Sequence, residues 1–306
     1  MALSRREFLT SAAGASAAVS LSGTVPAFLA RAAAAATDRR DTALVVVQLS
    51  GGNDGLNTVV PYADDAYGRA RRTLRLTARD VHKINEHVGF HPKLEGLARL
   101  SEQGRLAVIQ GVGYPGSDRT HERAMRDWHT ARPGAPQCPT GWVGRAVDAA
   151  PAADAGRVPG VFVGPIARPF ALTARKAVVP AIRSAGALTL RAAGGPADAP
   201  RRDDASPLAE HVRRAAQGAR AMSERIQAVL RDAPGAGRYP RQVLAGQLRT
   251  VAQLLRADVG IRIFFTELGG GGIGGFDNHA AQRDNHAALL KQLSDSVTAF
   301  VDDLDR

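Results

Sequence analysis

The chain has 306 residues, of which 44% are hydrophobic and 23% are charged, a balance typical of globular proteins. Its net charge of +11 does not indicate a nucleic-acid-binding surface, because the basic residues are scattered arginines without a Lys/Arg block and only 5% of the residues are aromatic. The single cysteine, Cys138, excludes an intrachain disulfide and a cysteine-based metal cluster.

The first 36 residues have the pattern of a twin-arginine signal peptide. Arg5 and Arg6 precede apolar residues, a weakly hydrophobic Ala/Ser/Gly stretch follows, and small residues suited to cleavage occupy 32–36. Pro26 and many small polar residues make the segment 10–30 a poor membrane anchor. The alternative interpretation is an N-terminal amphipathic helix.

This pattern predicts recognition by the twin-arginine export machinery and cleavage within 30–37. We expect a periplasmic or secreted protein, without a stable membrane span once the signal is removed. The twin-arginine route carries folded proteins, often with a cofactor already bound, which mildly favours a metal protein.

The mature chain, 37–306, opens on a strand and reads as an α/β domain. The β-branched run Leu44–Leu49 predicts a buried strand, and the glycine-rich loop after it contains Asp54. The elements expected next are a helix at 91–100, a second buried strand at 106–110 and a helix at 120–131 with Thr120 as its N-cap. Strand, helix and strand in this order predict a βαβ unit with parallel pairing.

The remaining elements alternate in the same way. They are a helix from Gly141, short strands at 160–164 and 177–179 within an irregular insertion or edge region at about 150–206, helices at 208–230 and 239–255, a strand at 261–265 and a helix at 280–304. Together they predict an α/β fold with a mostly parallel sheet.

Polar side chains follow two of the expected strands. Asp54 stands after the first strand, and Asp277 and His279 stand after the glycine-rich loop that follows 261–265. Because a parallel sheet gathers the carboxyl ends of its strands, we expect these loops to lie together. An Asp-x-His pair offers one oxygen and one imidazole nitrogen to a cation, whereas Asp54 equally fits a residue that caps its own turn.

A third polar group is expected at the start of the helix at 120–131. The Thr120 hydroxyl would lie beside the positive helix end, which favours a bound phosphate or sulfate, and a metal would make it a nucleophile. Arg123 would bind the anion as a fork. Thr120 also fits an ordinary N-cap, and His121 fits either a metal ligand or a surface side chain. Gln282 would orient His279.

Four segments resemble one large bacterial family whose members are typically exported by the twin-arginine route. They are 44–62, 89–128, 140–145 and 275–279 together with Gln282. The family is the domain of unknown function fifteen hundred and one, which is placed in the alkaline-phosphatase/sulfatase superfamily. The resemblance implies an alkaline-phosphatase-like three-layer α/β/α fold, a divalent metal (Zn, Mn, Mg or Ca) and a small anionic ester as substrate.

The resemblance also assigns roles to the candidate residues. Asp54 matches the superfamily's first-strand metal ligand, Asp277 and His279 match its later ligands, and Thr120 stands where the nucleophile would be. The chain departs from the family in its extra glycines before Phe276. It also ends before the family's Ser-Glu-Phe-Gly and Asp-His-Gly motifs, so we expect a site that is incomplete at the C-terminal side.

These observations lead to one expected function and two alternatives. The expected function is metal-dependent hydrolysis of phosphate or sulfate esters outside the cytoplasm, with Thr120 as nucleophile and Arg123 as the anion-binding group. The alternatives are a non-catalytic exported binding or assembly protein with a hydrolase-like fold, and an inactive truncated fragment.

Overall fold

The computed structural model describes residues 42–118, 120–149, 159–165, 167–182, 228, 237–269 and 275–306. The expected signal peptide, much of the irregular region expected at about 150–206 and nearly all of the helix expected at 208–230 lie outside these residues. Within the described part of the chain, no helix is both long and apolar enough to cross a membrane.

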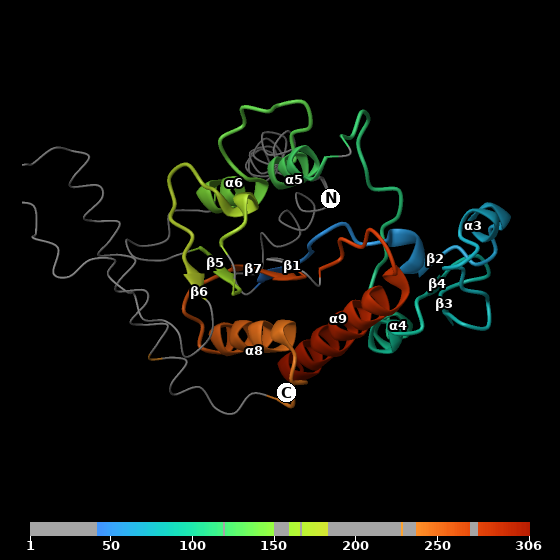
Figure 1. Cartoon of the computed structure of the whole chain (residues 1–306). Coiled ribbons are helices and arrows are strands. Elements are labelled where there is room, and N and C mark those ends of the chain that lie inside the picture. Colours follow the sequence, from blue (N-terminus) through green and yellow to red (C-terminus); the bar gives the residue numbers. More distant parts are fainter. Residues whose placement is uncertain are drawn as a thin grey trace, which may run out of the picture.

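A parallel four-stranded sheet forms the centre of the fold (Figure 1). Its strands are β1 (Leu44–Leu49), β5 (Gly160–Val163), β6 (Ala181–Ile182) and β7 (Ile263–Leu268), in the order β1-β7-β5-β6. Each neighbouring pair is parallel, and β1 pairs with β7 over its whole length. The expected α/β class with a mostly parallel sheet is confirmed.

Helices cover both faces of this sheet (Figure 1). One face carries α8 (Val243–Arg256) and α9 (Gln282–Leu304), with α4 (Glu95–Glu102) packed against α9. The other face carries α5 (His121–Thr130) and α6 (Trp142–Ala149), joined to the short 3-10 helix η2 (Phe170–Leu172). The arrangement has three layers, α/β/α.

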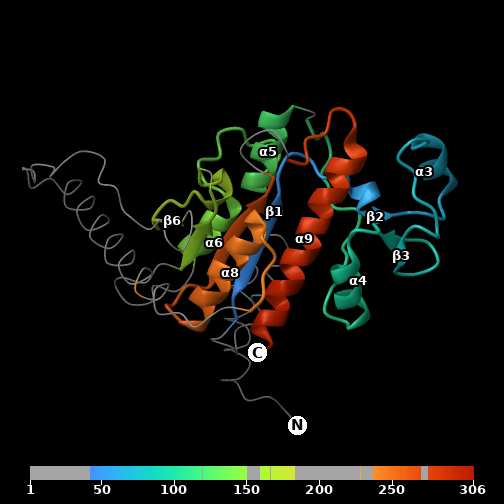
Figure 2. The ribbon, with the colours of Figure 1, turned by 60° about the horizontal axis from the view of Figure 1, so that its bottom comes forward.

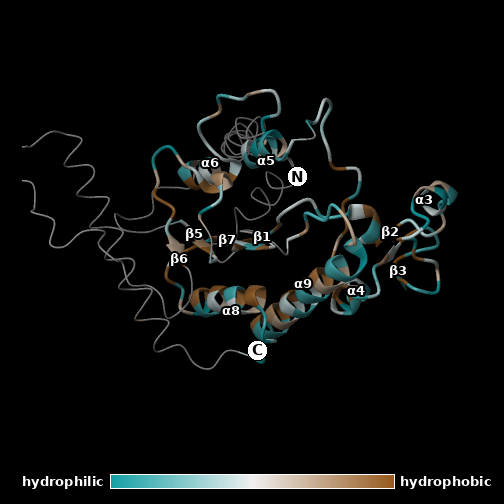
Figure 3. Cartoon of the chain, in the orientation of Figure 1, coloured by the Kyte–Doolittle hydropathy of each residue, from teal (hydrophilic) through white to brown (hydrophobic). Residues whose placement is uncertain are grey.

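Apolar side chains fill the space on each side of the sheet. The larger cluster joins one face of β7 to α8 and α9 through side chains such as Phe264, Leu248 and Leu290. The smaller cluster joins Phe265 of the same strand to Val143 and Val147 of α6. Phe264 and Phe265 therefore point to opposite faces, as adjacent residues of a strand must. In Figure 3, α5 is mostly hydrophilic, whereas α8 carries long hydrophobic stretches.

A second, smaller sheet stands beside the main one (Figure 2). It consists of the antiparallel strands β2 (Val59–Val60), β4 (Gly89–Phe90) and β3 (His82–Lys83). The 3-10 helix η1 (Gly55–Asn57) leads into it, and α3 (Asp65–Ala70) follows β2. This small unit lies between β1 and α4 in the sequence, where no strand was expected.

The strand expected at 106–110 is not formed, so the expected βαβ unit is wrong. The segment has no regular structure, and Val108 and Ile109 are 39% and 66% exposed. β1 instead pairs with β7, which is remote in sequence, and is an end strand of the sheet. A short apolar run has the same pattern whether or not the fold provides a partner strand.

Other elements lie close to their expected positions. The expected strand at 177–179 is replaced by β6, which begins two residues after the expected end, and Val179 is buried without belonging to a strand. Thr120 is the N-cap of α5, as predicted.

Candidate metal centre

The loops after β1 and β7 meet because these strands pair in parallel and end together. Leu49 lies opposite Leu268, the Ser50 amide donates to the Leu268 carbonyl (2.9 Å), and the Phe276 amide donates to the Ser50 carbonyl (3.0 Å). Gly51 has φ +104°, and a Cβ at this position would lie 2.6 Å from the Asp277 nitrogen. Only glycine allows this close approach without strain.

Three side chains from two distant segments converge beside this contact. The Asp277 carboxylate lies 2.9 Å from His279 Nε2 and 3.4 Å from His121 Nε2. One potential ligand atom from each residue lies within 4.8 Å of the other two. We call His121, Asp277 and His279 the candidate metal centre. Asp277 and His279 were predicted to act together, and His121 joins them because α5 begins there.

The candidate metal centre is open to solvent. The side chains of His121, Asp277 and His279 are 67%, 46% and 78% exposed. Exposed ion pairs contribute only about 0–1 kcal/mol to stability, so the cluster is not needed to hold the fold together. Its exposure leaves room for a cation and for further ligands such as water or a substrate.

Thr120 and Arg123 stand next to this centre on the first turn of α5. The Thr120 hydroxyl donates to Asp118 Oδ1 over 2.6 Å, and Asp118 Oδ1 also accepts the Thr120 amide (2.7 Å). These hydrogen bonds lower the pKa of Asp118. Arg123 Nε lies 3.9 Å from Asp118 Oδ2, and its side chain is 63% exposed. A potential nucleophile, a carboxylate and a guanidinium group therefore share one short segment.

Asp54 has a different set of contacts. Its carboxylate pairs with Arg71, accepts from Gln282 Nε2 (2.5 Å) and caps η1 through the Asn57 amide (3.3 Å). Burial raises the pKa of Asp54, but the hydrogen bonds from Arg71 and Gln282 and the charge of Arg71 outweigh it and hold the pKa below the ordinary value. Gln282, which was expected to orient His279, contacts Asp54 instead.

We expect Asp54→Ala to lower the free energy of unfolding by about 1–3 kcal/mol, because it leaves Arg71 and Gln282 without their partly buried acceptor. Urea denaturation monitored by circular dichroism measures this change. Any affinity of the candidate metal centre for Zn²⁺ should change by less than about twofold, because Asp54 lies outside this centre. A tenfold loss of affinity would instead support the ligand role that the family resemblance implies.

A buried polar network at the ends of β1 and β7 was missed by the sequence reasoning. Gln48 Nε2 donates to Ser50 Oγ (2.7 Å), Ser50 Oγ donates to Glu267 Oε2 (3.2 Å), and His129 Nε2 lies 2.9 Å from Gln48 Oε1. Burial raises the pKa of Glu267, and the hydrogen bond from Ser50 only partly opposes it. Burial lowers the pKa of His129. The sequence signal that could have indicated this network is the presence of the polar residues Gln48 and Glu267 inside apolar strand segments.

A second buried contact links the loop after β1 to α9. Asn53 Oδ1 lies 2.9 Å from His286 Nε2, and the His286 ring meets that of His91 edge to face at 6.0 Å between centroids. His91 is buried, and Lys93 donates its amide to His91 Nδ1 (3.1 Å). These two histidines belong to the packing beneath the loop rather than to the candidate metal centre.

In comparisons with known proteins, no family model, no curated protein and no solved structure matches this chain. The interpretation of the candidate metal centre therefore depends on its own geometry.

Proposed function

We propose that the chain is an exported, metal-dependent hydrolase of phosphate or sulfate esters with an alkaline-phosphatase-like fold. The observation that carries this proposal is the convergence of His121, Asp277 and His279 within 4.8 Å. The twin-arginine pattern of residues 1–36 supports export. The three-layer arrangement with its parallel sheet is compatible with the proposed fold.

The donor set fits a divalent transition metal. Two imidazole nitrogens and one carboxylate oxygen are the ligands of many catalytic zinc sites, which keep a further position open. Magnesium and calcium prefer ligand sets made of oxygen atoms. Among Zn, Mn, Mg and Ca, this set favours Zn²⁺, and His121, Asp277 and His279 would hold it.

The neighbouring side chains supply the remaining chemistry. Thr120 Oγ1 attacks the phosphorus or sulfur of the ester, and Asp118, which lies 2.6 Å from this hydroxyl, takes its proton. Arg123 and the free N–H groups at the start of α5 bind the non-bridging oxygens. The bond to the leaving alcohol breaks, and water then hydrolyses the ester formed on Thr120. A bound divalent cation would add Lewis-acid activation of the hydroxyl and the ester.

Metal binding and turnover test the proposal separately. Titration of the metal-free protein with Zn²⁺ in a calorimeter should show one saturable site, and Asp277→Ala and His121→Ala should each weaken it at least about tenfold, because each removes one of three ligands. Hydrolysis of an aryl phosphate or aryl sulfate should require Zn²⁺ and should be lost in Thr120→Val.

The matched control is His87→Ala, since His87 is exposed like the histidines of the centre but lies elsewhere. This variant should bind Zn²⁺ and turn over the esters like the unmodified chain. Wild-type affinity in Asp277→Ala would reject the candidate metal centre.

One observation favours a second candidate function, that of a non-catalytic binding protein. Asp54, which the resemblance assigns to the metal, is bound by Arg71. Saturable Zn²⁺ binding without multiple turnovers on either ester would select this function over hydrolysis.

A further inference from the structure

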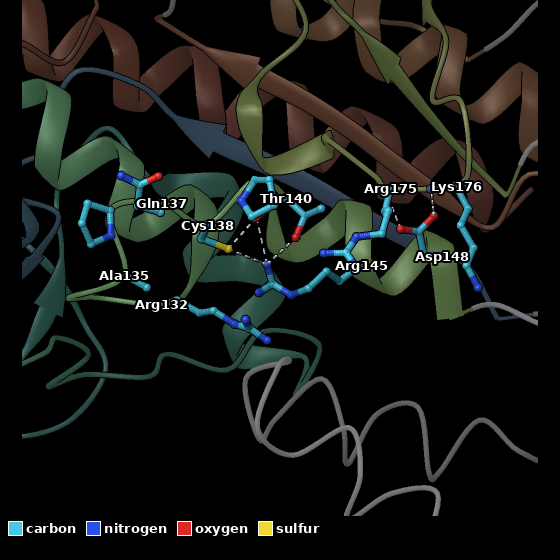
Figure 4. Close-up of a pocket in the computed structure, with 11 residues that line it drawn as sticks. Arg132, Ala135, Gln137, Cys138, Thr140, Arg145, Asp148, Arg175 and Lys176 are labelled. Carbon is cyan, nitrogen blue, oxygen red and sulfur yellow. Dashed lines mark hydrogen bonds between the residues drawn. The ribbon is translucent and has the colours of Figure 1, made fainter. Parts of the chain in front are cut away.

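A cavity of about 490 Å³ lies at the far end of α5 from the candidate metal centre (Figure 4). It is bounded by the loop that joins α5 to α6, by α6 itself and by the segment 175–176. Since α5 has 10 residues, its two ends are about 15 Å apart. The volume is in the range of sites for small molecules, about 300–1,000 Å³.

The charged residues that line the cavity are mainly positive. Its charged residues are Arg132, Arg145, Arg175, Lys176 and Asp148. Figure 4 shows Arg132 and Arg145 near Cys138, and Arg175 and Lys176 beside Asp148. Apart from Arg145, these cationic side chains form no hydrogen bond or ion pair with other described residues. Arg132, Arg175 and Lys176 are exposed and free to meet a ligand.

Among the described residues that line the cavity, the one carboxylate, that of Asp148, offsets only part of this positive charge. Asp148 accepts the backbone amides of Arg175 (2.7 Å), Lys176 (3.0 Å) and Ala177 (2.9 Å). Burial raises the pKa of Asp148, but these hydrogen bonds outweigh it and lower the pKa. Asp148 therefore holds the segment 175–177 in place, and the lining keeps a positive excess.

Hydrogen bonds from two arginine side chains, most of them partly buried, hold the walls of the cavity before any ligand arrives. Arg145 donates to the carbonyls of Thr140 (2.9 Å) and Thr130 (2.6 Å). From outside the cavity, Arg126 donates to the carbonyls of Pro136 (3.0 Å) and Cys138 (2.9 Å). A preformed site loses less conformational entropy on binding than a mobile one.

The positive charge around the cavity affects the pKa of the single cysteine of the chain. Cys138 is buried in the cavity wall and donates to the Thr140 carbonyl (3.3 Å). Burial raises the pKa of the thiol, but the hydrogen bonds of Thr140 and the charges of Arg145 and Arg132 outweigh it and lower the pKa.

The geometry points to a second binding site in this cavity, for a small molecule that carries at least two negative charges, such as a phosphate ester. A guanidinium group binds a phosphate or a carboxylate through two parallel hydrogen bonds to two of its oxygens. Arg132 and Arg175 each offer one such group. The site is separate from the candidate metal centre and does not depend on it.

Inorganic pyrophosphate is the probe for the first test. Calorimetric titration of the full-length chain, with a chelator present so that no metal participates, should show saturable binding that weakens as ionic strength rises. The double variant Arg132→Gln/Arg175→Gln should lose at least tenfold in affinity. The control Arg79→Gln/Arg306→Gln removes the same charge from exposed sites elsewhere and should change the affinity by less than twofold.

The thiol supplies a second test that needs no variant. Because the chain has one cysteine, alkylation by iodoacetamide reports on Cys138 alone, and pyrophosphate should slow it and raise the thiol pKa. Asp277→Ala should bind pyrophosphate normally, which separates this proposal from the proposed hydrolase. Absence of saturable binding, an equal loss in the control double variant, or alkylation unaffected by pyrophosphate would each overturn the proposal.

Discussion

Gly144→Ala is expected to lower the free energy of unfolding by at least about 3 kcal/mol, the upper part of the range for overpacked sites. Gly144 lies on α6 where the helix meets the segment after η2, and an added Cβ would overlap the Thr173 carbonyl and lie 2.7 Å from the Ala174 nitrogen. The added Cβ would clash with backbone atoms, which cannot move away by a change of rotamer as a flexible side chain can. Chemical denaturation monitored by circular dichroism measures the effect.

The matched control is Gly246→Ala in α8. Gly246 also lies inside a helix, but its added Cβ would meet nothing within 4 Å. Alanine is favoured over glycine in an exposed helix by about 0.5–1 kcal/mol, so this variant should be more stable than the unmodified chain. Equal stability of the two variants would show that α6 does not pack as closely as described.

The contact between Gly144 and the backbone after η2 explains a segment, 140–145, that stands out in the sequence only because it resembles a family motif. The sequence alone assigns this run no role. In the structure, added Cβ atoms at Gly141 and Gly144 would both overlap the backbone around η2, and Arg145 holds the loop before α6. The two glycines permit the approach and the arginine maintains it.

Elements with a strong local pattern were predictable. Leu44–Leu49, with its β-branched run, forms the expected strand, but its residues are half-buried rather than buried because β1 is an end strand of the sheet. The helix expected at 280–304 is formed as α9. The expectation that the loops after β1 and β7 lie together is confirmed, because these strands pair in parallel and Gly51 contacts Asp277. The prediction of a strand at 106–110 was wrong because an apolar pattern does not show whether the fold provides a partner strand.

The partners of charged side chains were less predictable, because they depend on distances across the fold. No pattern in the sequence shows that Arg71 pairs with Asp54, or that His121 reaches Asp277. The arginines of the cavity are far apart in sequence and looked like part of a scattered excess of charge. Only the packing of α5 and α6 against η2 brings them to one place.

Acidification from pH 7 to pH 5 is expected to lower the free energy of unfolding by about 2 kcal/mol through His91. Burial, together with the charges of His286, Lys93 and His82, lowers the pKa of His91 to about 4, whereas an unfolded histidine has a pKa of about 6.5. Between these values the unfolded chain binds the proton and the folded chain does not. Stability is therefore present above the unfolded pKa and is lost as pH falls toward 4.

Two other buried groups also change the free energy of unfolding between pH 7 and pH 5, in opposite directions. Burial also lowers the pKa of His286, so His286 adds to the loss of stability on acidification. Burial raises the pKa of Glu267, so the folded state holds this proton more tightly and the contribution of Glu267 improves as pH falls. The pH dependence of the unmodified chain contains both effects, and a variant is needed to isolate His91.

His91→Asn provides that variant, because its side-chain oxygen can accept the Lys93 amide in place of Nδ1. Urea denaturation at pH 7 and pH 5 should show a loss of stability that is smaller in His91→Asn than in the unmodified chain by about 2 kcal/mol. His87→Asn, at an exposed position, should keep the full loss. An identical pH dependence in His91→Asn and the unmodified chain would mean that His91 takes up a proton in the folded state as readily as in the unfolded one, and that the packing beneath the loop after β1 is open to water.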